Sequence, residues 1–433
     1  MRGAPLALAL AVMAAVAACA DEDPVSVNGD LIPLTPQTVE VILPWSEFGA
    51  EVEILGGFGT PSQLPGQVVS LDYRGELDSR ALVRFFPFPA SASVRDSTGT
   101  TRVDSAFTWL SGRVVARVDT LRTQVTGPVE MSLSRLDQDW HFRSATWDLL
   151  VDTVQDQRTW GEPGAGPGVS LGTAIWDPAQ GDSVVFPLDS ATVALFGDTT
   201  GVRTTARLDV ATPGVLLQLA DVDLRLDARP SINQDTVIVL NSGLRQGTFV
   251  YSPFPDPPPD GIRAGGAPAW RTVITMNIPR VLNGPEELCA QVGCPFSVEP
   301  TRLNHASLIL TSRASSPAAF QPSDSLLLDV RPVLVPERLP KAPLGPSFLG
   351  ILGRSVAPEA FGDAPGQQIP ITITEFVRGL VDPARADLLP NELALLSLLE
   401  PFSIGFGDFD GPGDPGEPVL RLILTASDPV EIR

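Results

Sequence analysis

Thr38-Val-Glu-Val-Ile-Leu43 lies near the start of the chain, and a similar segment, Thr236-Val-Ile-Val-Leu240, follows about 200 positions later. Both are rich in the β-branched and aliphatic residues that favour strands. Two more pairs of similar segments occur in the same order and at nearly the same offset: residues 102–106 with 302–306, and residues 224–228 with 422–426. Three pairs at nearly one offset predict a duplicated module.

Strand-like patterns dominate both copies. The segment Arg113-Val-Val-Ala-Arg-Val-Asp-Thr120 alternates polar and apolar residues, as a half-buried strand does. The 43 prolines and 38 glycines are spread along the chain, which is typical of many short strands joined by turns. One short helix is expected, with Thr374 as its N-cap and Leu380 at its end. The β-rich segment 190–197 is not expected to be helical.

The absence of a repeating strand–helix–strand pattern favours an all-β fold. We therefore expect two tandem antiparallel β-sandwiches, jelly-roll-like, at residues 37–229 and 233–428. The turn-rich segment 228–235 marks the expected boundary, near Pro230. Each module would be long enough to enclose a core between two packed sheets.

Residues 1–18 have the features of an export signal, with Arg2 followed by an apolar run that ends in small residues. Val16-Ala-Ala-Cys19 resembles the lipobox of bacterial lipoproteins, which implies cleavage before Cys19 and a lipid on its thiol. Residues 19–36 would then form a lipidated tether to a membrane surface. The expected location is the bacterial cell envelope, facing the periplasm or the exterior; the alternative is an ordinary signal peptide that contains a cysteine.

The two remaining cysteines, Cys289 and Cys294, form an even pair in an exported chain, which predicts a local disulfide. The alternative is two free thiols. A zinc site is not expected, because His141 and His305 are the only histidines of the chain.

The net charge is −21, and Lys341 is the only lysine among 30 basic residues. Nucleic-acid binding needs a basic patch, so this balance argues against it. An acidic surface instead keeps an exported protein soluble.

Several motifs resemble the DNRLRE-type β-sandwich domain, which is related to the disaggregatase-related repeats. The motifs are Arg80-Ala-Leu-Val-Arg-Phe85 with Pro87, Trp140, Thr146-Trp147 and Trp160-Gly-Glu-Pro-Gly164 in the first copy, and residues 271–276, 306–310, 371–378, 391–396 and 418–423 in the second. The resemblance covers most of residues 37–428. It implies exported, surface-associated, non-catalytic modules, some of whose relatives bind polysaccharides.

Sugar rings stack on flat aromatic faces, so the tryptophans of the first copy are the candidate ligand-binding residues. Trp160 and Trp176 flank a glycine-rich loop and are expected to be exposed, whereas Trp147 follows a strand pattern and is expected in the core. Trp45 and Trp140 complete the candidate set. The alternative is that all of them are core or rim residues.

Asp408, Asp410 and Asp414, with Glu417, resemble an acidic calcium-binding loop. The alternative is a solvated turn, because Asp and Gly are common in turns. No other cofactor is expected.

No catalytic motif stands out, and neither histidine has the sequence context of a triad base. We therefore expect a non-catalytic cell-envelope lipoprotein whose modules bind a polysaccharide or a surface partner. One alternative is a purely structural scaffold with no small ligand. Another is a hydrolase whose carboxylate pair spans separate strands, since such spacing is invisible in sequence.

Overall fold

The computed structural model describes residues 38–56, 67–125, 127–197, 204–266, 270–284, 286, 289, 294–385, 389–398, 400 and 403–425. Strands account for 51% of the structure and helices for 10%, and the sheets are antiparallel, so the expected all-β fold is confirmed. Among the described residues, no helix has the length and apolar character needed to cross a bilayer. The predicted signal peptide, the tether and Cys19 lie outside these residues.

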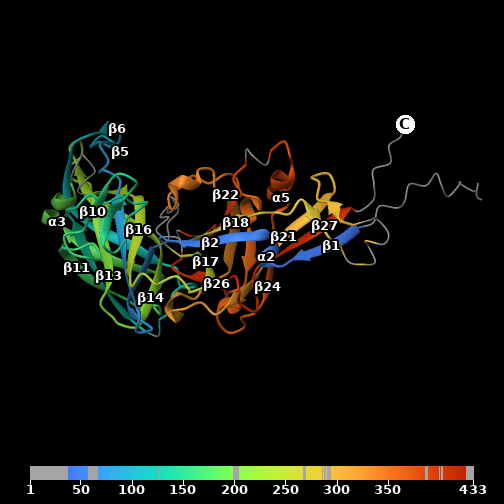
Figure 1. Cartoon of the computed structure of the whole chain (residues 1–433). Coiled ribbons are helices and arrows are strands. Elements are labelled where there is room, and N and C mark those ends of the chain that lie inside the picture. Colours follow the sequence, from blue (N-terminus) through green and yellow to red (C-terminus); the bar gives the residue numbers. More distant parts are fainter. Residues whose placement is uncertain are drawn as a thin grey trace, which may run out of the picture.

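The strands form two bodies (Figure 1). The first body is one ten-stranded sheet in the order β11-β8-β13-β4-β3-β14-β7-β12, with β15 on β14 and β16 on β4. Strands from along this order share one core, so the sheet folds over on itself. Its strands are β3 (Gln67–Tyr73), β4 (Leu77–Phe85), β7 (Phe107–Val118), β8 (Val129–Leu136), β11 (Gly168–Trp176), β12 (Ser183–Asp189), β13 (Thr205–Val210), β14 (Val215–Pro230), β15 (Ile238–Ser242) and β16 (Leu244–Ser252). Helix α3 (Ser190–Phe196) follows β12, and two hairpins form separate two-stranded sheets, β5 (Ala92–Arg95) with β6 (Thr101–Asp104) and β9 (Leu149–Asp152) with β10 (Gln157–Thr159).

The second body has two sheets. One has the order β2-β18-β25-β22-β23, and the other has the order β1-β27-β21-β26-β17 with β24 on β21. The strands are β1 (Thr38–Leu43), β2 (Gly49–Leu55), β17 (Gly261–Gly265), β18 (Arg271–Met276), β21 (Leu303–Arg313), β22 (Leu326–Pro332), β23 (Arg354–Val356), β24 (Gln368–Thr372), β25 (Glu392–Ser397), β26 (Phe406–Asp410) and β27 (Val419–Thr425). Shorter elements are α2 (Trp45–Phe48), η2 (Ala318–Phe320), η3 (Pro336–Arg338), η4 (Gly350–Leu352), η5 (Pro358–Phe361), α5 (Thr374–Val381) and the pair β19 (Val281–Leu282) and β20 (Phe296–Ser297).

The two bodies have matching strand orders. In the first body β15 pairs with β14, β14 with β7 and β7 with β12, after which α3 begins. In the second body β1 pairs with β27, β27 with β21 and β21 with β24, after which α5 begins. Likewise, the order β16-β4-β13-β8-β11 matches β2-β18-β25-β22-β23. The echoed sequence segments lie in or just before these matching strands.

The bodies nevertheless do not follow the expected ranges 37–229 and 233–428. We call residues 38–55 (β1, α2 and β2) the N-terminal arm and residues 238–252 (β15 and β16) the middle arm. The N-terminal arm completes the second body, through β1 on β27 and β2 on β18, and appears in blue among its strands in Figure 1. The middle arm completes the first body, through β15 on β14 and β16 on β4. The first two strands of each half of the chain therefore lie in the body that is built mainly from the other half.

The expected boundary near Pro230 is a tight reversal of the chain within the first body. Leu226 of β14 faces Leu240 of β15, so the strands on either side of the turn are paired neighbours. Asp104 fixes this turn, because its carboxylate accepts hydrogen bonds from the Ser231 hydroxyl and the Ile232 N–H. The residue pattern of the segment indicated a turn correctly, but the turn closes a hairpin and does not separate the two bodies.

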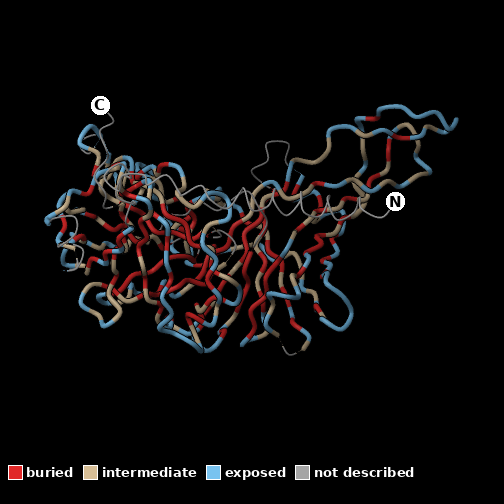
Figure 2. The backbone as a smooth tube through the Cα atoms, turned by 90° about the vertical axis from the view of Figure 1, so that its right-hand side faces the viewer, coloured by how far each residue is buried: buried red, intermediate tan, exposed pale blue. Residues whose placement is uncertain are grey.

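The N-terminal arm fits the second body because its apolar side chains alternate. Every second residue of β1 is buried, and Val39, Val41 and Leu43 enter the core of the second body together with Phe48 of α2. On the outer face, Arg421 of β27 makes a two-pronged ion pair with Glu40 at 2.8 and 3.0 Å. Figure 2 shows the buried inner lengths of the strands and the exposed turns at their ends.

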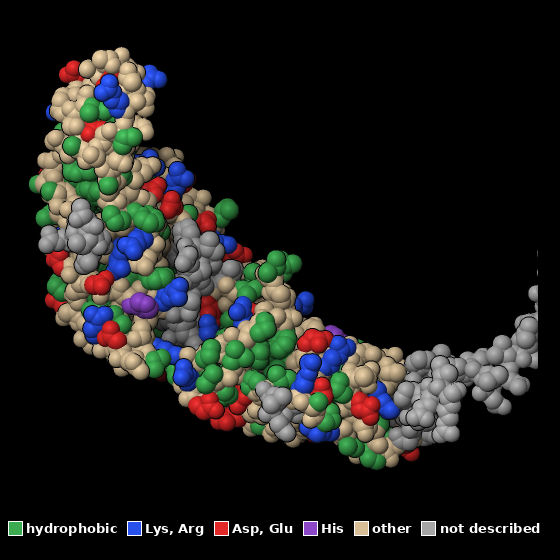
Figure 3. All heavy atoms as spheres, turned by 90° about the horizontal axis from the view of Figure 1, so that it is seen from above, with side chains coloured by type: hydrophobic (Ala, Val, Ile, Leu, Met, Phe, Trp, Pro, Cys, Tyr) green, Lys and Arg blue, Asp and Glu red, His purple; other side chains and the backbone are tan. Residues whose placement is uncertain are grey.

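A shared apolar cluster joins the bodies. Val68, Leu77 and Leu216 of the first body pack with Phe320 and Phe406 of the second. Polar contacts surround the cluster: Arg122 pairs with Asp324 at 3.0 Å, Lys341 with Asp152 at 3.0 Å, and Arg74 donates to the carbonyl of Ala318 at 2.7 Å. Seen from above, the result is a curved, elongated molecule with acidic and basic side chains interspersed on the visible face (Figure 3).

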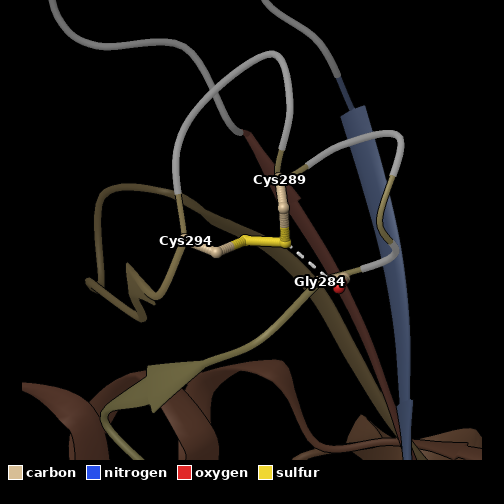
Figure 4. Close-up of a disulfide and its surroundings, with 3 residues drawn as sticks. All are labelled: Gly284, Cys289 and Cys294. Atoms are coloured by element: carbon tan, nitrogen blue, oxygen red, sulfur yellow. Dashed lines mark hydrogen bonds between the residues drawn. A yellow bond between two sulfur atoms is a disulfide. The ribbon is translucent and has the colours of Figure 1, made fainter.

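Two local predictions have clear outcomes. The disulfide between Cys289 and Cys294 is present, and the Cys289 Sγ lies 3.2 Å from the Gly284 carbonyl oxygen (Figure 4). The predicted helix at Thr374 forms as α5, but Thr374 does not cap it. The Thr374 hydroxyl instead accepts a hydrogen bond from the Ala306 N–H, which ties the helix to β21.

Candidate functional site

Three of the candidate tryptophans are buried. Trp140, Trp160 and Trp176 are 2%, 5% and 1% exposed, so the expected exposure of Trp160 and Trp176 is wrong and none of the three offers a face to a ligand. The glycine-rich loop folds over its own small core, where Trp140 and Trp160 pack together with Leu82. The indole N–H of Trp160 donates to the Thr146 carbonyl and that of Trp176 to the Gly181 carbonyl, which satisfies both groups internally.

Trp45 and Trp147 remain partly exposed. Trp45 lies in α2 and packs edge-on against Phe48, with ring centroids 5.3 Å apart. Trp147 was expected in the core, but it lines a groove of about 420 Å³ beside the middle arm. We call this the aromatic groove; its lining residues are Gly56, Thr146, Trp147, Asp148, Tyr251, Ser252 and Phe254.

Arg80 holds Trp147 in place from within the first body. The Arg80 guanidinium lies 4.8 Å from the centre of the Trp147 ring, a cation–π contact. It also donates to the Gly164 carbonyl at 2.6 Å and pairs with Asp209 at 3.3 Å. Desolvation on burial lowers the pKa of Arg80 from its usual value, and the Asp209 carboxylate opposes this shift.

Gly164 is required behind Trp147 for two reasons. Its φ of +75° lies in the left-handed region that favours glycine. A Cβ at this position would also lie 2.8 Å from the Trp147 ring and 2.7 Å from the Arg80 guanidinium. The Gly164 N–H donates to the Trp147 carbonyl at 2.7 Å, so the glycine-rich loop fixes both the backbone and the ring of Trp147.

Tyr251 and Phe254, which also line the groove, belong to a stack of aromatic rings. Phe254 lies between Tyr251 and Trp270, with centroid distances of 6.0 and 4.7 Å and interplanar angles of 25° and 28°. Phe254 is 45% exposed, whereas Tyr251 and Trp270 are buried. Such a stack presents one rigid aromatic surface at little cost in side-chain entropy, because the rings beneath it hold Phe254 in place.

The groove also carries polar groups. Thr146, Asp148 and Ser252 line it beside the rings, and the Asp148 side chain lies at an exposed position. Among the described residues, the Tyr251 hydroxyl is buried and has no hydrogen-bond partner. Burial raises the pKa of Tyr251, so the hydroxyl stays neutral. Aromatic faces beside hydroxyl and carboxylate groups are the combination that holds a polyhydroxylated ring.

The calcium candidates do not form a cation site. The Asp408 carboxylate is 2% exposed and accepts from Arg263 at 2.7 and 2.9 Å, so it is already neutralised. Asp414 accepts from the Gly411 N–H at 2.9 Å and lies 3.5 Å from Arg313. Desolvation and the nearby Asp414 carboxylate raise the pKa of Asp410. Within the described residues, no three His, Cys, Asp or Glu side chains are placed to share a metal ion.

The two histidines lie apart, in local contacts. His141 Nδ1 is 2.8 Å from the hydroxyl of Ser144, three positions along the same turn. Desolvation, followed by the charges of Arg143 and Arg84, lowers the pKa of His141. His305 Nδ1 is 3.5 Å from the Thr374 hydroxyl, in the contact between β21 and α5. Both histidines support the chain locally.

A second, more open groove crosses the junction of the bodies. It measures about 1150 Å³ and lies between residues 152–157 of the first body and residues 337–343 of the second. Lys341 bridges it, donating to the Asp152 carbonyl at 2.7 Å and pairing with its carboxylate. None of its described lining residues is aromatic, so the aromatic groove is the better candidate for a site that recognises flat rings.

Comparison with known proteins adds no functional information. No family model matches the chain, and no curated protein matches it. One chain of a solved structure, described as "Life in the extremes: atomic structure of Sulfolobus Turreted Icosahedral Virus", aligns at 8% identity over 91% of this chain and 98% of that chain, with a TM-score of 0.10. A TM-score this low carries no argument about the fold.

Proposed function

We propose that this protein is a non-catalytic lipoprotein of the bacterial cell envelope that binds a polysaccharide in the aromatic groove. The sequence at Val16–Cys19 supports the lipid anchor. The motifs quoted above support a relationship to the DNRLRE-type domains. The binding proposal depends on one observation: Trp147 and the Phe254 stack line a single groove together with hydroxyl and carboxylate side chains.

The groove suits a sugar ring because its rings are fixed before a ligand arrives. Arg80 and Gly164 hold Trp147, and Trp270 and Tyr251 hold Phe254. Little side-chain entropy is then lost on binding, so more of the stacking energy contributes to affinity. The exposed Asp148 carboxylate and the hydroxyls of Thr146 and Ser252 supply partners of the kind that sugar hydroxyls use.

The test is a glycan array followed by affinity electrophoresis of the full chain. The double variant Trp147→Ala/Phe254→Ala should lose at least about tenfold in affinity, because each stacked aromatic contributes on the order of 1 kcal/mol. Phe86→Ala is the matched control, since Phe86 is 52% exposed and lies outside the groove. Retention of a glycan by wild type and by the control, but not by the double variant, supports the proposal.

Failure of the wild-type chain to bind any glycan would instead favour the structural alternative. One observation supports that second candidate: the exchanged arms and the shared apolar cluster join the two bodies into one elongated unit that is suited to a spacer. In that case the partner is a protein of the envelope, and crosslinking in cells followed by mass spectrometry would identify it.

A further inference from the structure

We propose that the N-terminal arm of one copy of this protein can occupy the arm site of a second copy, so that the chain forms arm-exchanged dimers. The arm site is the pair of strand edges, on β27 and β18, that β1 and β2 cover. The occupant is a second copy because the arm and its site are complementary within one sequence. Exchange of an identical element between copies is a low-cost route to dimers.

The N-terminal arm lies at sheet ends. β1 is the last strand of the six-stranded order and β2 the last strand of the five-stranded order, so each has one paired neighbour in the described structure. Release of the arm therefore breaks one ladder in each sheet, from Thr38–Thr425 to Leu43–Leu420 and from Gly49–Met276 to Leu55–Arg271, and leaves the other strands paired. Edges exposed in this way are templates for a strand from another chain.

Within the described residues, the N-terminal arm is continued by other strands on one side only, from β3 onward. The middle arm differs, because β14 precedes it and β17 follows it, one in each body. Release and replacement are consequently easier for the N-terminal arm than for the middle arm.

The contacts between the arm site and the N-terminal arm are made mainly by side chains, and they do not require that the two belong to the same copy. Four side chains of the arm fill the core of the second body: Val39, Val41, Leu43 and Phe48. The other strands of that body come much later in the sequence, from Gly261 onward. Arg421 selects Glu40 on the outer face, and the Asn277 N–H donates to the Phe48 carbonyl at 2.7 Å. An arm from a second copy would bring the same groups.

The middle arm provides an independent precedent within the molecule. It fills the matching site of the first body, although the repeat from which it comes builds the second body. Each arm site is therefore filled by a pair of strands from the other half of the chain. Arm exchange between two copies would use these same contacts and no new ones.

The experiment uses two tagged full-length preparations of different mass, Ile42→Cys and Arg421→Cys, which face each other in the β1–β27 register. The two are unfolded together, refolded at high protein concentration and oxidised. We expect a heterodimer on a non-reducing gel, with a 42–421 disulfide joining the two chains in peptide mass spectrometry. The collision control pairs Ile42→Cys with Ile351→Cys, since Ile351 is 95% exposed in η4 and is no part of the β1–β27 register. Heterodimer no more abundant than in this control would overturn the proposal.

A second measurement avoids new cysteines and follows the Glu40–Arg421 ion pair. In a mixture of Glu40→Arg and Arg421→Glu chains, like charges meet within each copy, whereas exchange between copies restores both ion pairs. An equal mixture that pairs at random gives twice as much heterodimer as either homodimer. Native mass spectrometry should show more heterodimer than this, about four times either homodimer, a modest preference because exposed ion pairs are weak. The chain that carries both substitutions restores the pair internally and should show no such enrichment. A statistical mixture, with only twice as much heterodimer as either homodimer, would contradict the proposal.

Discussion

Phe48→Ala should destabilise the second body, and Val250→Ala should destabilise the first body. Phe48 lies in the first half of the chain, but its side chain is 1% exposed in the core of the second body. Val250 lies in the second half of the chain but is fully buried with Leu82 and Trp140 of the first body. Removal of a buried Phe side chain costs about 3–5 kcal/mol. Removal of the two Val methyl groups costs about 2 kcal/mol, including the residual cavity.

Hydrogen exchange followed by mass spectrometry locates the loss. Phe48→Ala should lower protection in β27 and β18 by at least about a hundredfold, because 1.4 kcal/mol corresponds to a factor of ten. Val250→Ala should instead act on β4, whose residue Arg80 faces Val250. Each variant is the control for the other. A loss of protection in β4 but not in β27 for Phe48→Ala would refute the strand exchange, as would identical exchange patterns for the two variants.

Three further predictions follow from single residues. Asp408→Ala leaves the Arg263 guanidinium, 1% exposed, without its carboxylate and should lower the free energy of urea unfolding by about 3–5 kcal/mol. Glu40→Gln, at an exposed ion pair, should leave the urea midpoint nearly unchanged. Equal shifts would show that the buried pair contributes no more to stability than the exposed pair. Asp221→Asn should raise stability at pH 7. Desolvation, with the Asp223 carboxylate, raises the pKa of Asp221 above 3.8, so the wild type is stabilised below pH 3.8 and loses that contribution as pH rises through the folded-state value. The gain should disappear in unfolding curves recorded below pH 3.8, and a gain independent of pH would contradict this cause. Cys19→Ser should abolish fatty-acid labelling and move the protein from the membrane fraction to the aqueous fraction, and unchanged labelling would exclude the lipid anchor.

The alternating apolar residues predicted the strands well because each strand has one face toward a core. The echoed segments lie in or just before strands that occupy matching places in the two strand orders. The partners of the arms could not be predicted, since β1 and β15 present similar alternating faces, and sequence similarity identifies a kind of strand rather than its neighbour. The pairing of β1 with β27 joins residues at the two ends of the described chain and depends on the arrangement of the whole fold.

The tryptophans show a second limit of the sequence. Trp160 was expected to be exposed because glycines follow it, but the loop turns inward and buries it with Trp140. Trp147 was expected to be buried, yet Arg80 and Gly164 hold it at the groove. Phe254, which also lines the groove, comes just after the middle arm, so the groove depends on the middle arm lying in the first body. The helix α3 was also missed, although Asp189 caps it by accepting from the Thr192 N–H at 2.8 Å.

A crystal structure of the full chain with an oligosaccharide retained in the glycan screen would test the central claim most directly. The proposal predicts a sugar ring stacked about 4 Å from the face of Trp147 or Phe254, with hydroxyls within hydrogen-bond distance of Asp148 or Ser252. An oligosaccharide bound elsewhere on the molecule, with the aromatic groove empty, would contradict it.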